Sequence, residues 1–349
     1  TTSTNPTTGL AGYYQFSNLV PDDYIVTFVT PLNYKVTSAN TTGDALDSDI
    51  DAVTGNSPLT NLVSGESDQT VDAGIYRQGS IGDLVWTDTN GNGIKDPTET
   101  GVNGVTVLLK DALGNVLQTA VTTNSPTTGA PGYYNFTVDP GTYIVMVMAP
   151  TGTTISPNGP VNPTTGNTAP ITVTSGSTNT TTDAGLYQAA SIGNYVWEDA
   201  DKDGIQDGTE LGVNGVTVQL KNAAGTILQT TTTSTNPTTG GAGYYQFSNL
   251  VPGDYIVTFV TPLNYKVTSA NTTGDALDSD IDAVTGNSPL TNLVSGESDQ
   301  TVDAGIYRQG SIGDLVWTDT NGNGIKDPTE TGVNGVTVLL KDASGNVLQ

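Results

Sequence analysis

The chain has 349 residues, no cysteine, no histidine and a formal net charge of −25 at pH 7. These absences exclude disulfides, cysteine nucleophiles, Ser-His triads, and metal sites built on imidazole or thiolate. Ten Lys and Arg against 35 Asp and Glu argue against binding to nucleic acid or anionic lipid, which both need cationic partners. No apolar run approaches the length of a membrane span, so we expect no membrane insertion in this segment.

The sequence repeats itself over a long period, since residues 1–118 recur as 232–349 with three differences. A weaker repeat lies within that period, because SIGDLVW or SIGNYVW begins at Ser80, Ser191 and Ser311. A unit of this length is one small domain, not one turn of a solenoid. We therefore predict the C-terminal part of a long module at 1–79, a complete short module at 80–190, a complete long module at 191–310, and the N-terminal part of a long module at 311–349.

Within the short module, apolar runs rich in β-branched residues alternate with turns rich in Gly, Pro and Asn. This pattern is typical of a β-sandwich, and no window shows a helical period. The predicted strands are Ile81–Thr87, Val102–Lys110, Val116–Val121, Gly132–Thr137, Thr142–Met148, Ala169–Thr174 and Thr181–Tyr187. The aromatic residues expected in the core are Trp86, Tyr133, Phe136 and Tyr143.

The connections between modules are short. Only Arg77–Ser80 separates the last strand pattern of one module from the first of the next, and this stretch lacks the composition of a flexible linker. We therefore predict an all-β chain of tandem sandwich modules that form a semi-rigid rod.

A short acidic loop follows the first strand of each visible module. DTNGNGIKDPTE at 88–99, DADKDGIQDGTE at 199–210 and DTNGNGIKDPTE at 319–330 all fit the EF-hand calcium pattern D-x-[DN]-x-[DN]-G-x5-E. Calcium takes six to eight oxygen ligands, and this spacing supplies them from side chains and one carbonyl around a turn that requires glycine. The predicted ligands are Asp88, Asn90, Asn92, Ile94, Asp96 and Glu99; Asp199, Asp201, Asp203, Ile205, Asp207 and Glu210; and Asp319, Asn321, Asn323, Ile325, Asp327 and Glu330.

The 199–210 loop carries five carboxylates where the 88–99 loop carries three, so we expect the former to bind calcium more tightly. Strands rather than helices flank these loops, which predicts a structural role and not a helix-opening sensor. A solvated acidic turn is the simpler interpretation, but the pattern recurs three times with its glycine in place.

A second acidic cluster, GDALDSDID, is present only in the long modules. It predicts a further calcium site or, alternatively, a solvated loop. Its carboxylates are Asp44, Asp47, Asp49 and Asp51, repeated as Asp275, Asp278, Asp280 and Asp282. Asp72 or Asp303, in the TVDAGIY segment, is a weaker candidate for an additional ligand.

The strings IGDLVWTDTNGNGIKDPTETGVNGVTVLLKD, GYYQFSNLVPGDYIVTF, ALDSDIDAVTG and TVDAGIY resemble the SdrD-type B domain, one of the Cna-B-like repeats of bacterial surface adhesins. The resemblance covers both complete modules. It implies an Ig-like or transthyretin-like (Cna-B-type) β-sandwich, Ca²⁺ at the EF-like loops and often at further acidic loops, and a place in a stalk. Related Cna-B domains carry an isopeptide bond that starts from a lysine. The first strands here have no lysine, so we expect none.

The leading functional hypothesis is an extracellular, calcium-rigidified stalk or filament, secreted or on a bacterial cell surface. The alternative is a repetitive adhesin region that binds a host or surface ligand by avidity. An enzyme is not expected, because the calcium loops already account for many of the acids. The partners expected are identical modules, reached by covalent continuation of the array or by self-association.

Overall fold

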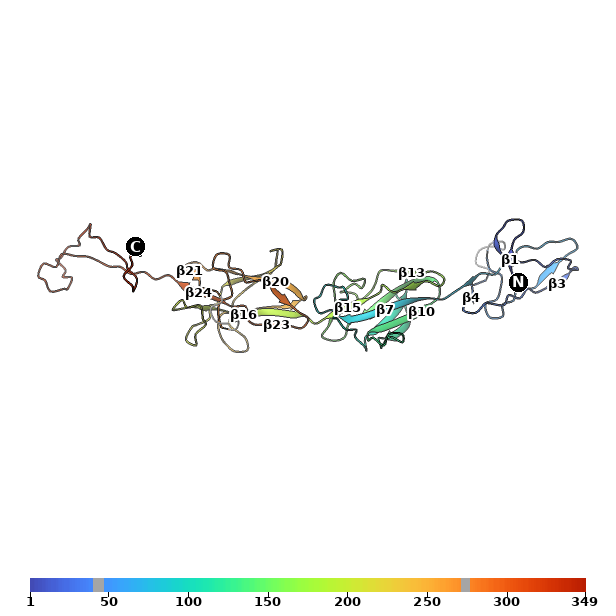
Figure 1. The fold of residues 1–349 in the computed structure, drawn as a ribbon, viewed down its shortest axis with the longest axis horizontal. Coiled ribbons are helices and arrows are strands. Elements are labelled where there is room, and N and C mark those ends of the chain that lie inside the picture. Colours follow the sequence, from blue (N-terminus) through green and yellow to red (C-terminus); the bar gives the residue numbers. More distant parts are fainter. Residues whose placement is uncertain (40–46, 271–276) are drawn as a thin grey trace.

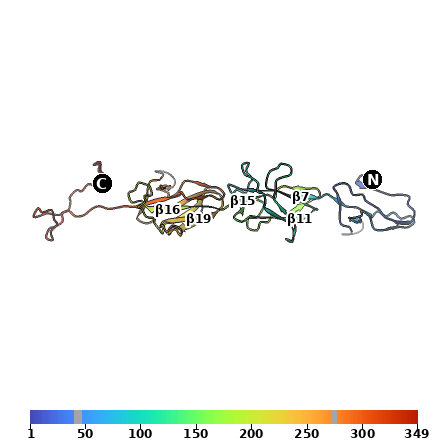
Figure 2. The ribbon, with the colours of Figure 1, turned by 90° about the horizontal axis from the view of Figure 1, so that it is seen from below.

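The computed structural model describes residues 1–39, 47–270 and 277–349. These residues form strands and turns and contain no helix, which confirms the all-β prediction. The modules lie end to end along one axis, as two perpendicular views show (Figures 1 and 2), so the array has the predicted shape of a rod. In the part of the chain that the structure describes, no helix is long and apolar enough to cross a membrane.

The short module is a sandwich of two sheets. Its strands are β7 (Gly79–Thr87), β8 (Thr106–Asp111), β9 (Val116–Val121), β10 (Tyr133–Val138), β11 (Gly141–Met148), β12 (Thr154–Ile155), β13 (Ile171–Val173), β14 (Thr178–Asn179) and β15 (Ala184–Tyr187). One sheet has the order β10-β7-β15-β12, with β14 also on β7, and the other has β13-β11-β8-β9. The first strand pairs in parallel with the last, which closes the module on itself.

The long module repeats this topology. Its strands are β16 (Ala190–Glu198), β17 (Thr217–Asn222), β18 (Ile227–Thr232), β19 (Tyr244–Leu250), β20 (Gly253–Val260), β21 (Tyr265–Val267), β22 (Thr291–Leu293), β23 (Ser298–Asp299) and β24 (Ala304–Arg308). The sheets have the orders β19-β16-β24-β21, with β23 on β16, and β18-β17-β20-β22.

The partial modules at the two ends have less structure. The described part of residues 1–78 forms six short strands: β1 (Ser3–Thr4), β2 (Ala11–Tyr13), β3 (Asp22–Tyr24), β4 (Lys35–Val36), β5 (Thr60–Leu62) and β6 (Ile75–Tyr76). After β24 the described chain has only isolated bridges. Residues 311–349 match 80–118 at all but one position, so they begin a short module. The assignment of this segment to a long module was wrong.

Each complete module has its own apolar core, and strand alternation decides which aromatic rings enter it. Trp86 and Phe136 are buried as predicted. Tyr134, two residues before Phe136 and therefore on the same face, is buried in place of Tyr133, which is half-buried. Tyr143 is half-buried and packs against the edge of the core.

The structure shifts several predicted boundaries and adds two strands. The strands predicted at 169–174 and 181–187 shorten to Ile171–Val173 and Ala184–Tyr187. Residues 102–105 form a turn, since Gly104 has a φ of 86°, so the predicted strand at 102–110 begins at Thr106. The strands β12 and β14 have two residues each, too few for a sequence pattern to reveal.

Candidate calcium centre

The 88–99 loop begins where β7 leaves the sheet. Asp88 is fully buried, and its N–H donates to the carbonyl of Leu186 in β15 (2.8 Å). Its Oδ2 accepts a hydrogen bond from the N–H of Gly93 (2.8 Å), which folds the loop around the carboxylate. Its Oδ1 is buried without a hydrogen-bond partner. A buried carboxylate oxygen without a partner is unfavourable unless a cation or proton neutralises it.

Further oxygens of this loop gather around the same turn. The N–H groups of Thr89 (2.6 Å) and Asp96 (3.0 Å) donate to the two carboxylate oxygens of Glu99. The side-chain amides of Asn90 (2.8 Å) and Asn92 (3.3 Å) both donate to Oδ2 of Asp96. Loop positions three, five, nine and twelve are therefore linked through hydrogen bonds within the loop.

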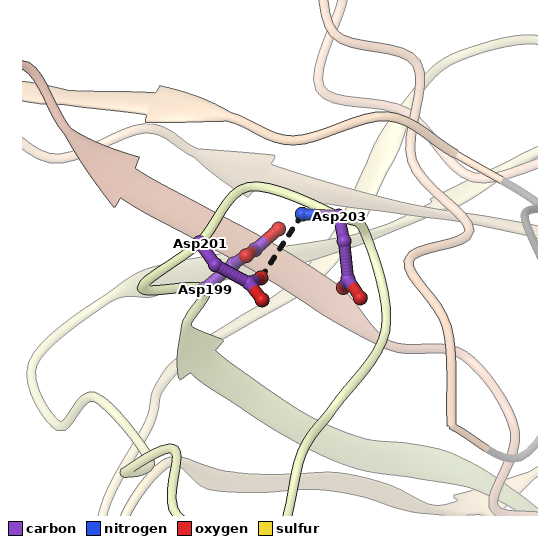
Figure 3. A group of neighbouring side chains, drawn as sticks. All are labelled: Asp199, Asp201 and Asp203. Atoms are coloured by element: carbon purple, nitrogen blue, oxygen red, sulfur yellow. Dashed lines mark hydrogen bonds between the residues drawn. The ribbon is translucent and has the colours of Figure 1, made fainter.

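The 199–210 loop has the densest charge. Carboxylate oxygens of Asp199, Asp201 and Asp203 lie within 4.8 Å of one another, and Figure 3 shows the three side chains around one turn of the loop. Asp199 is fully buried, and it accepts hydrogen bonds from the N–H of Gly204 (3.0 Å) and the hydroxyl of Thr268. Three carboxylates this close repel one another unless a cation lies between them. Thr268 carries no signal in the sequence that predicts this role.

The 319–330 loop adopts the same geometry without a sandwich around it. The N–H of Gly324 donates to Asp319 (2.8 Å), and those of Thr320 (2.7 Å) and Asp327 (3.0 Å) donate to Glu330. The hydrogen bond from Gly324 lowers the pKa of Asp319. The loop conformation is therefore a property of the loop sequence itself.

The second acidic cluster lies directly against the 199–210 loop. The N–H of Gln206 donates to the carbonyl of Leu277 (2.6 Å), and the N–H of Ser279 donates to the carbonyl of Gly204 (3.2 Å). This pairing buries Asp278 and Asp280 beside the loop, so two acidic segments that are far apart in the chain form one region.

Asp303 connects this region to β24. Its N–H donates to Oδ2 of Asp280 (2.6 Å), and its own carboxylate accepts hydrogen bonds from the N–H of Tyr195 and the amide of Asn194 (both 3.0 Å). Burial raises the pKa of Asp303 to about 8, the charges of Asp280 and Asp278 add to this, and the two hydrogen bonds oppose it. The environment of this region therefore favours the protonated, neutral form of Asp303.

The remaining members of the cluster lie elsewhere. Oδ1 of Asp282 accepts hydrogen bonds from the N–H groups of Val284 (3.1 Å) and Thr285 (2.7 Å), so this carboxylate caps its own turn, and Asp51 does the same in the first module. In that module Oδ2 of Asp49 accepts the N–H of Asp72 (2.6 Å), as Asp280 does with Asp303. Asp47 is half-buried beside this pair. Asp44 and Asp275 lie outside the described residues.

The donor set fits a hard divalent cation. Carboxylate and amide oxygens are the ligands that calcium prefers, and the loops supply them beside a buried carboxylate oxygen that has no partner. Among the predicted loop positions, Asp199, Asp201 and Asp203 are the carboxylates that the structure places close enough to hold one ion. The ion would neutralise their charge and cross-link the loop.

A carboxylate pair that the sequence analysis missed lies in the short module. Asp183, the counterpart of Asp303, accepts the N–H of Leu84 (3.1 Å) and faces Asp83. Burial, followed by the charge of Asp83, raises the pKa of Asp183 to about 6. The long module has Asn194 where the short module has Asp83, and that difference was the available signal.

We expect Asp83→Asn to stabilise the short module by about 1 kcal/mol at pH 7, because it removes a like charge and supplies an amide donor to Asp183. Since the pKa of Asp183 is higher in the folded state than in the unfolded chain, wild-type stability falls as pH rises from about 4 to 6. The variant should flatten this fall. Urea unfolding at several pH values, followed by fluorine NMR of fluorotryptophan at Trp86, measures both effects. A lower stability of the variant at pH 7 would contradict the interpretation.

Comparison with known proteins identifies the family of the chain. The family model described as "SdrD B-like domain" matches residues 1–75, 79–186, 190–306 and 310–349. Serine-aspartate repeat-containing protein D of Staphylococcus aureus (strain Newman) is 41% identical over 348 residues, which cover 97% of this chain and 25% of that protein. Serine-aspartate repeat-containing protein F of Staphylococcus epidermidis is 39% identical over 354 residues, which cover 98% and 19%. The chain thus spans about a quarter or less of these relatives.

The solved structures that match are much less similar in sequence. The minor pilin GBS52 of Streptococcus agalactiae is 11% identical, with a TM-score of 0.27, over 68% of this chain and 99% of the pilin. The shaft pilin SpaA of Lactobacillus rhamnosus GG is 10% identical, with a TM-score of 0.23, over 68% and 100%. The family model covers nearly every residue of both complete modules and of both partial ones, and the chain belongs to the SdrD B-like domain family.

Proposed function

We propose that the chain is a segment of a structural stalk or filament outside a bacterial cell, built from β-sandwich modules that Ca²⁺ stabilises in the loops 88–99, 199–210 and 319–330. The observation that carries the proposal is the buried Oδ1 of Asp88 at the first position of the 88–99 loop, which has no hydrogen-bond partner. The proximity of Asp199, Asp201 and Asp203 supports the same role in the long module. None of the relatives and solved structures named above is called an enzyme, and we assign no catalytic role.

A cation in these loops would act on the shape of each module. In both complete modules the loop connects the first strand of one sheet to the first strand of the other, so cross-linking it would fix the two sheets at one end of the sandwich. Without the cation, the carboxylates repel one another and the loop must open or take up protons.

Calcium removal should therefore shorten the rod in solution. We expect small-angle scattering of the full chain to give a smaller maximum dimension and a broader distribution of lengths in EGTA than in millimolar calcium. Magnesium at the same concentration serves as the control, since it prefers a rigid octahedral shell that this loop does not supply. An unchanged scattering curve in EGTA would overturn the role of calcium as a stiffener.

Contacts with further identical modules are the second part of the proposal. Side chains that complete modules bury are exposed at the two ends: Phe16 is 64% exposed where its counterpart Phe247 is 2% exposed, and Val338 is 74% exposed where Val107 is 0% exposed. Continuation of the array or a second copy of the chain would cover them. Sedimentation of native and denatured material separates these cases, because only association between chains depends on concentration.

Ligand binding by avidity is a second candidate function. The near-identity of 1–118 and 232–349 presents the same side chains again along the rod, as avidity requires. Binding of the full chain to a glycan array or host extract, compared with a one-module fragment, tests it. Equal binding by both would exclude avidity.

A further inference from the structure

Both kinds of module junction share one pair of hydrogen bonds. At the long-to-short junction, the N–H of Arg77 donates to Oγ of Ser175 (2.9 Å) and the N–H of Gly176 donates to the carbonyl of Arg77 (3.1 Å). At the short-to-long junction, Gln188 makes the equivalent bonds to Ser295 (2.8 Å) and Gly296 (3.0 Å). These contacts hold the connecting residue against a turn of the following module.

The short-to-long junction adds the calcium loop itself. The carbonyl of Thr89, at loop position two, accepts the N–H of Ser295 in the next module (2.8 Å). The N–H of the same residue donates to Glu99, which closes the loop (2.6 Å). One residue therefore connects the closing carboxylate of the loop to the neighbouring module.

Gly91, at loop position four, packs against the next module at Val251 and Pro252, which lie between β19 and β20 and are called the leading turn here. A Cβ added there would lie 2.8 Å from the carbonyl oxygen of Pro252 and 2.9 Å from Cγ1 of Val251. Gly91 also has a φ of 69°, a conformation that side chains disfavour. The backbone of the loop is thus in direct contact with the neighbour, and only a glycine leaves room for it.

The long-to-short junction has different chemistry. Nζ of Lys35 lies 3.1 Å from Oδ1 of Asp139, which also accepts the side-chain amide of Gln78 (2.9 Å). Asp139 begins the leading turn of the short module, where the long module has Val251. An aspartate at that position would face the acidic calcium loop in the short-to-long junction.

The residue at loop position four also differs between the two kinds of module. The long module has Lys202 where the short module has Gly91, and the ammonium of Lys202 lies 5.0 Å above the ring of Tyr307 in its own module. The trailing loop of the long module thus presents a lysine at this position, and that of the short module presents a glycine.

We propose that the 88–99 loop is also a docking surface, whose partner is the leading turn of a long module at Val251 and Pro252. This rests on the proposed function, because the calcium that orders the loop then also sets the angle between the two modules. The alternation of short and long modules follows from two interfaces with different chemistry, one polar and charged, the other between a glycine loop and an apolar turn.

The test measures a distance across this junction in the full chain. The chain has no cysteine, so Leu113→Cys and Thr238→Cys, both in exposed turns, place two spin labels on either side of it. In calcium we expect one narrow distance distribution. Gly91→Ala should broaden it, whereas Gly322→Ala should not, because Gly322 has nearly the same φ (70°) and no atom within 4 Å of an added Cβ.

A second variant covers the case in which Gly91→Ala disturbs its own loop. Val251→Asp introduces the charge of Asp139 on the other side of the same contact, at a half-buried position outside the apolar core, and should also broaden the distribution. If both variants leave the distances as narrow as in the wild type with calcium present, the docking surface is refuted.

EGTA separates this inference from the proposed function. Broader distances together with a lower unfolding temperature support both. A lower unfolding temperature with unchanged distances refutes the junction and leaves the calcium role standing. An unchanged unfolding temperature refutes the calcium role. The distance distributions of Gly91→Ala and Val251→Asp then still test whether the loop contacts the leading turn.

Discussion

Chelation of calcium should lower the unfolding midpoint of the 191–310 module by roughly 10–20 °C. At free calcium a hundred to a thousand times Kd, one site adds about 3–4 kcal/mol to the free energy of unfolding. For a domain of this size, ~1 kcal/mol moves the midpoint by about 3–6 °C. The effect should be larger here than in the 80–190 module, because the 199–210 loop holds five carboxylates and lies against Asp278 and Asp280.

The chain carries its own reporters for this experiment. Trp86, Trp197 and Trp317 each lie at the start of one module, so a fluorotryptophan-labelled chain gives one fluorine NMR signal per module during heating. Asp199→Asn should abolish the calcium effect at Trp197 and leave the effect at Trp86 intact, because it removes a buried charge from one loop only. Identical melting of the wild-type modules in calcium and EGTA would contradict the proposed function.

Gly212→Ala should destabilise the long module by about 3 kcal/mol, the upper part of the range for an overpacked site. A Cβ at residue 212 would lie 1.7 Å from the carbonyl oxygen of Ala242, which is backbone and cannot rotate away. The residue closes the calcium loop onto the first strand, since it bridges to Trp197. The substitution therefore separates the end of the loop from the strand that begins it.

Gly208→Ala is the matched control for that substitution. It lies in the same loop, and an added Cβ would meet nothing within 4 Å. The free energy of unfolding of the Gly208→Ala variant should stay within about 0.5 kcal/mol of that of the wild type, as for surface substitutions in general. Urea unfolding followed at Trp197 measures both variants. Equal stabilities would show that the backbone contact at Gly212 has no importance for the fold.

The sequence alone predicted the sandwich and the position of its acidic loops because both depend on short-range patterns. Alternation of apolar and polar residues identified most strands of the short module, and turn residues separated them. The same alternation places Tyr134 rather than Tyr133 in the core. The prediction of Tyr133 was wrong because it considered each aromatic residue separately. The strands β12 and β14 escaped prediction because their pairing with distant strands, not their composition, makes them strands.

The sequence by itself determined the conformation of each acidic loop that fits the EF-hand pattern. Residues 319–330 make the same hydrogen bonds to Asp319 and Glu330 without any sandwich around them, because the donors and acceptors all lie within the loop. Only the tertiary structure buried Asp88 and Asp199, since β15 and β24 cover them from the other end of the module.

Pairing between distant segments decided the position of the second acidic cluster and the contact between modules. It brought the second acidic cluster against the 199–210 loop through the contact between Gly204 and Ser279, and it placed Gly91 against the next module at Pro252. These contacts join residues that are far apart in the chain, and no periodicity or spacing in a sequence specifies which distant backbone groups will pair.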